Sequence, residues 1–253
     1  MRRIAIAGAT GAVGRHLVDA VREAGDEPVP MSRALGVDLT RREGLAERLE
    51  GCDAVVDVSS TQSLSTKVAI EYFTTVTENL LAAGREAGVA HHIALSIVGA
   101  ADSDSGYYAG KAAQERLVMA HDERWTLLRA TQFHEFAAQV VARGRTLGLY
   151  LAPRMHCRPV AASEVATALA GLAAGGPRGL VPDLGGPRVE RMADLVRRYL
   201  RATGGRGGVL EVRLPGSMGR ILVDGRLIPG PDATLGRVTF DEWLATTLAP
   251  QPT

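Results

Sequence analysis

Tyr107 and Lys111 stand four positions apart in a segment, residues 107–120, whose apolar positions recur with a helical period. Residues at i and i+4 of a helix are neighbours, so the Lys111 ammonium can lie beside the Tyr107 phenol, or both can reach one ligand. A phenol has an ordinary pKa of about 10, and lowering it to about 7 needs roughly 4 kcal/mol of preferential stabilisation of the anion, part of which a nearby ammonium can supply. The pair therefore indicates acid–base chemistry. Tyr108 is a rival for the acid role, and packing of the Tyr107 ring is the alternative interpretation.

Three glycines, Gly8, Gly11 and Gly14, follow the apolar run Arg3–Ala7 and lead into an amphipathic segment, 14–24. In a strand–turn–helix of this kind the first glycine permits the tight turn, the second lets the backbone approach a pyrophosphate, and the third lets the helix close on the strand. The start of the helix then presents free N–H groups to the anion. The alternative is an ordinary strand-to-helix turn. The pattern predicts a dinucleotide held at this turn by Gly8, Thr10, Gly11, Ala12, Val13 and Gly14.

Ser32 and Arg33, which follow the second apolar run, bear on the choice of dinucleotide. A carboxylate about 20 residues past the glycine motif would bind the ribose hydroxyls of NAD and repel a 2′-phosphate. Arg33 stands in that region instead; it can make a bidentate contact with phosphate, and Arg15 can add a second positive charge. The alternative is that both arginines are solvated surface residues. The sequence favours NADP (NADPH) over NAD.

These residues need a scaffold in which strands alternate with helices. Strand-like runs occur at 3–7, 28–31, 54–58, 92–96, 126–129 and 179–181, and helical patterns at 14–24, 65–87, 107–120 and 163–174. The alternation predicts an α/β fold, a doubly wound parallel sheet (Rossmann) with helices on both faces. Residues 37–39 fit it badly, because only residues 32–36 separate them from the second strand and a parallel crossover needs more. They are either a rudimentary edge strand or no strand.

The last third of the chain predicts a small C-terminal lobe on the substrate side. We expect residues 1–253 to form a single NAD(P)-binding Rossmann domain, with residues 151–253 contributing most of this lobe. A cationic amphipathic helix is predicted at 189–201, packed through its apolar face with its arginines in solvent. A closing helix is predicted at 240–244.

Composition excludes several classes of function. The chain has 253 residues and a formal net charge of +1, so it lacks a broad basic field and nucleic acid is not expected as a partner. Cys52 and Cys157 cannot build a disulfide framework, and neither they nor His91 and His92 have metal-ligand spacing, so no metal is expected. No apolar run is long enough to span a bilayer, and the N-terminal run breaks at Gly8, too early for a signal-peptide core. We expect a cytoplasmic protein without a membrane partner.

The order of these motifs resembles that of atypical, NmrA-like members of the short-chain dehydrogenase/reductase superfamily. The resemblance covers roughly the first two-thirds of the chain and rests on the glycine turn, Arg33, Asp38-Leu39, Val58-Ser59-Ser60, Leu95-Ser96-Ile97-Val98-Gly99, Tyr107 with Lys111, and the run from Thr126 to Phe133. It implies cofactor contacts from Ser32, Arg33, Asp38, Leu39, Ser59, Ser60 and Lys111. It also implies that Ser96 holds a substrate carbonyl, that Tyr107 donates a proton and that Lys111 holds the ribose.

Phe133 and His134 follow the run at 126–129. Loops at the carboxyl ends of strands line the ligand crevice of open α/β sheets, so we expect these two residues to contact substrate. Helix capping or packing is an equal alternative for His134.

Two functions from different classes follow. The first is an NADPH-dependent oxidoreductase that reduces a small carbonyl, enone or quinone-like substrate by hydride transfer, with Ser96, Tyr107 and Lys111 as catalytic residues. The second is a non-catalytic redox sensor that binds NADP(H) and passes its occupancy to a partner protein. Sugar-nucleotide epimerisation is a weaker third, because the lobe is small for a second nucleotide. The sequence predicts neither the substrate's identity nor the oligomeric state.

Overall fold

The computed structural model describes residues 1–63, 65–121 and 124–249, which form two compact units. The first unit consists of Met1–Arg129 and Val165–Pro182, and the second of Ala130–Glu164 and the chain from Asp183 onward. None of the helices in the described ranges combines the length and the apolar character that crossing a membrane requires.

A sheet with the strand order β2-β1-β3-β4-β5 forms the centre of the first unit, with β8 also paired to β5. The pairs β1·β2, β1·β3, β3·β4 and β5·β8 are parallel. The order reverses between β1 and β3, and open α/β sheets bind ligands at the carboxyl ends of the strands at such a point. All six strands predicted from the sequence are confirmed to within one residue at each end: β1 (Arg3–Ala7), β2 (Glu27–Met31), β3 (Ala54–Asp57), β4 (His91–Ile97), β5 (Trp125–Ala130) and β8 (Gly179–Leu180).

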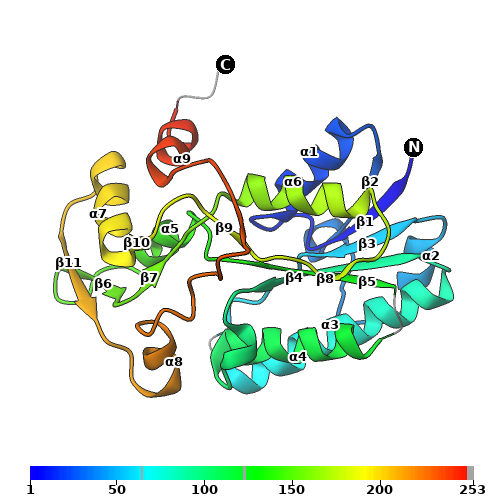
Figure 1. Cartoon of the computed structure of the whole chain (residues 1–253), viewed down its shortest axis with the longest axis horizontal. Coiled ribbons are helices and arrows are strands. Elements are labelled where there is room, and N and C mark those ends of the chain that lie inside the picture. The colour runs from blue at the N-terminus through cyan, green and yellow to red at the C-terminus, as the bar shows by residue number, and fades with distance from the viewer. Residues whose placement is uncertain (64, 122–123, 250–253) are drawn as a thin grey trace. The chain divides into compact units, whose positions relative to one another are not determined.

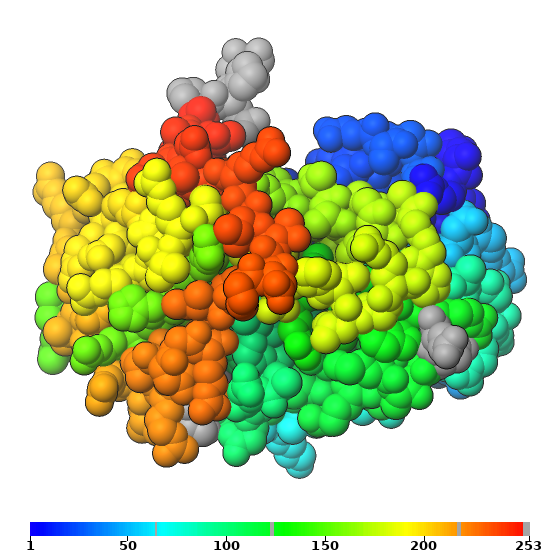
Figure 2. All heavy atoms as spheres, in the orientation of Figure 1, coloured from blue at the N-terminus to red at the C-terminus, as the bar shows by residue number. Residues whose placement is uncertain are grey.

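Helices cover both faces of this sheet (Figure 1). On one face lie α1 (Gly14–Glu23) and α6 (Ala162–Ala173), most of which belongs to the first unit, and on the other lie α3 (Thr66–Glu86) and α4 (Gly106–Ala120). A short 3-10 turn, Ala100–Asp102, connects β4 to α4. The outer side of α6 (yellow-green) lies at the surface in Figure 2. Ser163 and Thr167 of this helix are exposed. The doubly wound, Rossmann-like α/β fold predicted from the sequence is thus confirmed.

The connection between β2 and β3 shows what residues 37–39 do. They form no strand; they follow the 3-10 turn Arg33–Leu35, and the Asp38 carboxylate accepts hydrogen bonds from the Thr40 amide and hydroxyl, which turns the backbone. The buried side chains of Val37 and Leu39 belong to the apolar core that also contains both leucines of α2 (Leu45–Leu49) and residues of β1 and α3. A turn therefore buries these apolar side chains, and the interpretation that residues 37–39 form no strand is confirmed.

Helices α3 and α4 approach each other closely at Gly110. A Cβ atom there would lie 2.6 Å from Cδ2 of Phe73 and 2.8 Å from the carbonyl carbon and oxygen of Ala69. We expect Gly110→Ala to lower the free energy of unfolding by about 1–3 kcal/mol, because backbone and ring must shift to admit the methyl group. Urea unfolding measures this. Gly171→Ala on α6 is the matched control, because a Cβ there meets nothing within 4 Å; equal stability of the two variants would contradict the close approach.

The second unit is built from short strands and helices. Its strands pair as β6 (Leu149–Pro153) with β11 (Gly208–Val212) in parallel and β7 (His156–Cys157) with β10 (Glu190–Arg191) in antiparallel orientation. Strand β9 (Leu184–Gly185) pairs with β12 (Thr234–Leu235) and with Ala130. The helices are α5 (Phe136–Ala142), α7 (Met192–Ala202), α8 (Gly216–Ile221) and α9 (Phe240–Thr247).

The prediction of a helix from residue 189 is wrong at its start. Glu190 and Arg191 are extended because they pair with Cys157 and His156, so α7 begins only at Met192. The predicted closing helix is confirmed as part of α9. A capping box, in which the Thr239 hydroxyl accepts from the Glu242 amide and the Glu242 carboxylate accepts from the Thr239 amide, fixes its start.

Candidate functional site

The glycine turn after β1 is held by close backbone contacts. Gly8 has φ +90° and donates its N–H to the Met31 carbonyl at 2.8 Å. A Cβ at Gly8 would lie 2.8 Å from the Ser59 N and Cα atoms, and one at Gly14 would collide with the Gly8 carbonyl oxygen and lie 2.7 Å from the Ala9 Cα. Gly11 differs, because it is exposed and a Cβ there would meet only the Gly8 oxygen, at 3.2 Å. Two of the glycines therefore serve the fold, while Gly11 leaves space at the surface.

The first turn of α1 offers unused hydrogen-bond donors beside that space. The Gly11 amide donates to Gly8, but the amides of Thr10, Ala12 and Val13 donate to no acceptor within the described part of the chain. No side chain caps the helix. Free N–H groups at a helix start, together with the helix dipole, bind phosphate. The turn therefore fits the pyrophosphate of a dinucleotide.

Ser59 and Ser60, at the carboxyl end of β3, bring the turn and Tyr107 together. The Ser59 backbone is the surface against which Gly8 packs, and its amide donates to Oδ1 of Asp57 at 2.9 Å. Ser60 is exposed, and its Oγ lies 3.3 Å from the Tyr107 hydroxyl oxygen. The sequence places these residues 47 positions apart, and the sheet brings them into contact.

Tyr107 lies in the first turn of α4, where its half-buried ring packs edge-to-face on Phe73 with 5.3 Å between ring centroids. Burial raises the pKa of Tyr107 to about 12, while the hydrogen bond with Ser60 opposes the rise. The phenol is therefore fully protonated at neutral pH. The sequence pattern predicted that Lys111 would help to lower the pKa of Tyr107. Lys111 does not do so, because its ammonium donates to the Leu95 carbonyl and to Gln114.

Lys111 is buried among fixed partners. Its Nζ donates to the Leu95 carbonyl at 2.9 Å and to Oε1 of Gln114 at 2.8 Å, and it lies 4.2 Å from the centroid of the Phe73 ring. Gln114 in turn donates from Nε2 to Oδ2 of Asp57 at 2.7 Å. Burial lowers the pKa of Lys111 to about 8, against the opposing effect of the Asp57 and Glu115 carboxylates. Phe73 contacts both Lys111 and Tyr107. The two residues thus pack on the same ring, and Lys111 donates its hydrogen bonds to Leu95 and Gln114 instead of Tyr107.

Ser96 lies near the end of β4, one position after the carbonyl that binds Lys111. It is 4% exposed, and its Oγ has no hydrogen-bond partner within residues 1–63, 65–121 and 124–249. Its neighbour Leu95 binds Lys111, but in the described ranges no hydrogen bond joins the Ser96 hydroxyl to Lys111 or Tyr107. Its role at a substrate carbonyl stays a prediction.

The end of β2 carries the residues expected to select the dinucleotide. Ser32 is buried and Arg33 is exposed, with no ion pair in the part of the chain described here. Hydrogen bonds from Thr40 hold the pKa of Asp38 below its usual range, with smaller contributions from Arg41 and Arg33. Leu39 is buried, and its carbonyl accepts from the Asn79 side chain at 3.0 Å. Arg33 is thus free to meet an anion, while Asp38 is committed to its own turn.

Phe133 and His134 belong to the second unit. Phe133 bridges to Val160, and His134 is 1% exposed, with Nε2 hydrogen-bonded to the Val238 carbonyl at 3.0 Å. The His134 ring also contacts Phe240 and Trp243, and burial lowers its pKa. These contacts show a packing role for His134; a substrate role for either residue stays a prediction.

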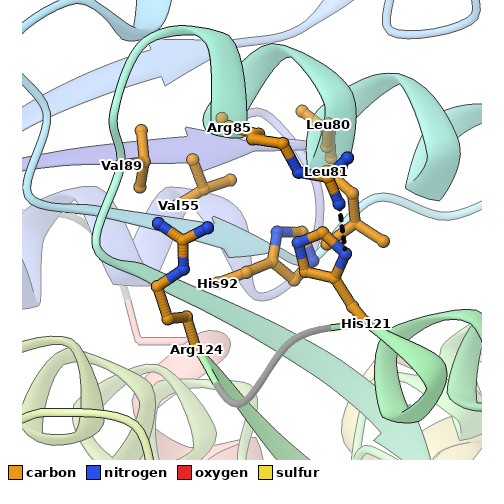
Figure 3. Close-up of a pocket in the computed structure, with 9 residues that line it drawn as sticks. Val55, Leu80, Leu81, Arg85, Val89, His92, His121 and Arg124 are labelled. Atoms are coloured by element: carbon orange, nitrogen blue, oxygen red, sulfur yellow. Dashed lines mark hydrogen bonds between the residues drawn. The ribbon is translucent and has the colours of Figure 1, made fainter.

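A small cavity of about 20 Å³ lies at the amino ends of the strands, opposite the glycine turn (Figure 3). Val55 and His92 line it near the amino ends of β3 and β4, and Arg85 hydrogen-bonds His121 across it at 3.1 Å. It is large enough for about one water molecule. Within the described ranges no three His, Cys, Asp or Glu side chains are placed to hold a metal ion, and Cys52 and Cys157 are buried free thiols.

Asp57 and Gln114 join the site although sequence reasoning missed them. Two signals could have found them. Asp57 ends a fully apolar buried run, where a carboxylate needs a partner, and Gln114 stands three positions after Lys111 on one helix face.

The comparisons with known proteins agree with this geometry. A family model described as NAD(P)H-binding matches residues 8–170. The fold resembles an NADPH-dependent quinone oxidoreductase from Escherichia coli (TM-score 0.69, 16% identity, 96% of this chain and 99% of that chain). It also resembles a UDP-N-acetylglucosamine 4-epimerase from Bacillus cereus (TM-score 0.72, 16% identity, 100% of this chain and 98% of that chain). A third similar structure is a dTDP-4-dehydrorhamnose reductase from Bacillus anthracis in complex with NADP (TM-score 0.66, 14% identity, 84% of this chain and 85% of that chain). At these identities the likeness shows the fold. No curated protein matches the sequence.

Proposed function

This chain belongs to the NAD(P)H-binding family, and from that premise we propose that it is an NADPH-dependent oxidoreductase of a small carbonyl, enone or quinone-like substrate. One observation carries the proposal: the glycine turn, with its free amides, lies against Ser59, which follows β3, and the next residue, Ser60, contacts Tyr107. A dinucleotide site and a protonated phenol thus meet at the carboxyl edge of one sheet.

In the proposed reaction NADPH, when bound, supplies a hydride to the substrate carbon. The amides of the glycine turn hold phosphate, and Lys111 holds the ribose through the N–H that Leu95 and Gln114 leave free. Tyr107 donates its hydroxyl proton to the oxygen on which negative charge develops, and Ser96 holds that oxygen. Because burial raises the pKa of Tyr107 to about 12, its hydroxyl keeps its proton at neutral pH and is available as the donor.

Arg33 is the basis for NADPH in this proposal. The quinone oxidoreductase that this chain resembles is named NADPH-dependent, and the dehydrorhamnose reductase holds NADP. Another structure of this fold holds NAD. We expect NADPH to bind at least about tenfold tighter than NADH, a difference of about 1.4 kcal/mol, and Arg33→Asp to erase or reverse it. Titration calorimetry with both cofactors measures this. Arg48→Asp, which makes the same charge change on α2, should keep the preference; equal affinities in the parent protein would remove Arg33 from the site.

Fluorescence of bound NADPH, followed by its oxidation in the presence of ketones, enones and quinones, tests the function directly. Binding followed by oxidation with one of these classes supports the proposal. Oxidation by none of them favours the second candidate, a non-catalytic NADP(H) sensor. The contacts of Lys111 favour that candidate, because its ammonium donates to the Leu95 carbonyl and the Gln114 side chain rather than to Tyr107. The epimerase likeness extends over 98% of that chain, so a sugar nucleotide belongs in the substrate panel.

A further inference from the structure

We propose that Asp57 and Gln114 are positioning residues for Lys111, with the Asp57 carboxylate acting on the Lys111 ammonium through the Gln114 amide. The inference deepens the proposed function, because Lys111 is the residue assigned there to the ribose. It rests on three buried side chains from β3 and α4, which are 0%, 0% and 3% exposed at Asp57, Gln114 and Lys111.

The geometry of Gln114 fixes its orientation. Oε1 faces an ammonium at 2.8 Å and Nε2 faces a carboxylate oxygen at 2.7 Å, so exchanging the two ends of the amide would set donor against donor and acceptor against acceptor. Both hydrogen bonds are charge-assisted, and each polarises the amide in the direction that strengthens the other. Asp57 is itself held by the Ser59 amide at Oδ1. The arrangement therefore has one stable alignment, and it ends in the backbone against which the glycine turn packs.

The surroundings of Lys111 leave little else to compensate its charge. From β4 it receives the Leu95 carbonyl and from α3 the face of the Phe73 ring. The carboxylates that act on it are Asp57 and Glu115, and Glu115 is engaged by Arg129 in two hydrogen bonds of 2.8 and 2.6 Å. Asp57 is thus the one of the two that reaches Lys111 through a hydrogen-bonded link. Removing its charge leaves a buried ammonium with less compensation, and Lys111 must then lose its proton at lower pH.

The chain permits an unusually direct test, because Lys67 and Lys111 are its only lysines. Protein labelled with ¹³C at lysine Cε should give two resonances in a pH titration, and Lys67→Arg assigns them. We expect Lys111 to titrate near pH 8, because burial lowers its pKa. In Asp57→Asn the Lys111 midpoint should fall by about one pH unit. In Gln114→Leu it should fall as well, because Nζ then loses an acceptor and its hydrogen-bonded link to Asp57.

Asp102→Asn is the matched control, since it removes an exposed carboxylate just before α4, and it should leave the Lys111 midpoint unchanged. A lower Lys111 midpoint in the two test variants supports the proposal, and either variant suffices if the other fails to fold. A Lys111 midpoint that does not move in a folded Asp57→Asn protein, or that moves equally in Asp102→Asn, overturns it.

NADPH affinity measured against pH separates this inference from the proposed function. If both hold, the alkaline loss of affinity should move to lower pH in Asp57→Asn by the same interval as the Lys111 resonance. If the resonance moves and NADPH does not bind the parent protein at any pH, the coupling to Lys111 stands and the proposed function fails. If NADPH binds and its pH dependence is the same in the parent and in Asp57→Asn, the positioning role fails and the proposed function stands.

Discussion

Tyr107→Phe should lower turnover by about 10²–10⁴, the usual contribution of a positioned acid–base group, and leave NADPH affinity nearly unchanged. The substitution keeps the ring and its edge-to-face contact with Phe73, and it removes only the hydroxyl that lies 3.3 Å from Ser60. A loss confined to the rate constant therefore reports proton transfer rather than packing. Steady-state oxidation of NADPH by a substrate found in the panel gives turnover, and fluorescence titration gives affinity.

Tyr108→Phe is the matched control for that experiment. Tyr108 is the next residue on α4, has the same side chain, is 9% exposed and packs its ring edge-to-face on the Tyr107 ring. Turnover and NADPH affinity should stay within about twofold of the parent values, as for a residue outside the chemistry. If Tyr107→Phe turns over as fast as the parent, or if Tyr108→Phe carries the loss instead, Tyr107 is not the proton donor.

Strands β1 and β3 could be predicted because they are buried on both faces of a parallel sheet and therefore appear as nearly continuous apolar runs. The run Ala54–Asp57 is buried throughout, and its only polar residue is the last. The apolar residues Val37 and Leu39 gave the same signal over a shorter stretch, yet they are buried from a turn. Burial sets the apolar pattern, and a stretch this short does not distinguish an extended backbone from a turned one.

The candidate site could be predicted only where its contacts are local. The glycine turn is contained within one strand–turn–helix, so the spacing of its glycines predicts the turn and the start of the helix. The orientation of Lys111 depends on three segments that are distant in sequence: β3 through Asp57, β4 through the Leu95 carbonyl, and α3 through Phe73. The i, i+4 spacing correctly put Lys111 and Tyr107 on one helix face but did not show which buried groups would bind the ammonium.

Gly11→Val should abolish NADPH binding, a loss of at least about 100-fold or roughly 2.7 kcal/mol, and leave the protein folded. Gly11 is exposed, its φ is not positive, and an added Cβ meets only the Gly8 oxygen at 3.2 Å, so the backbone can accept a side chain with a small adjustment. The two further methyl groups of valine then occupy the space before the free amides of α1, where the pyrophosphate must lie. Calorimetry measures the binding, and circular dichroism with thermal unfolding measures the fold.

Gly14→Ala supplies the contrast that gives this result its meaning. Its Cβ would collide with the Gly8 carbonyl oxygen and lie 2.7 Å from the Ala9 Cα, so the helix could not close on the strand. We expect this variant to lose stability by about 1–3 kcal/mol or more, and to lose binding only as a consequence. Gly11→Val should thus affect NADPH binding alone, whereas Gly14→Ala should affect the fold and, through the fold, NADPH binding. A Gly11→Val protein that binds NADPH with the affinity of the parent would show that the turn is structural alone, and the cofactor would then have to be sought elsewhere on the sheet.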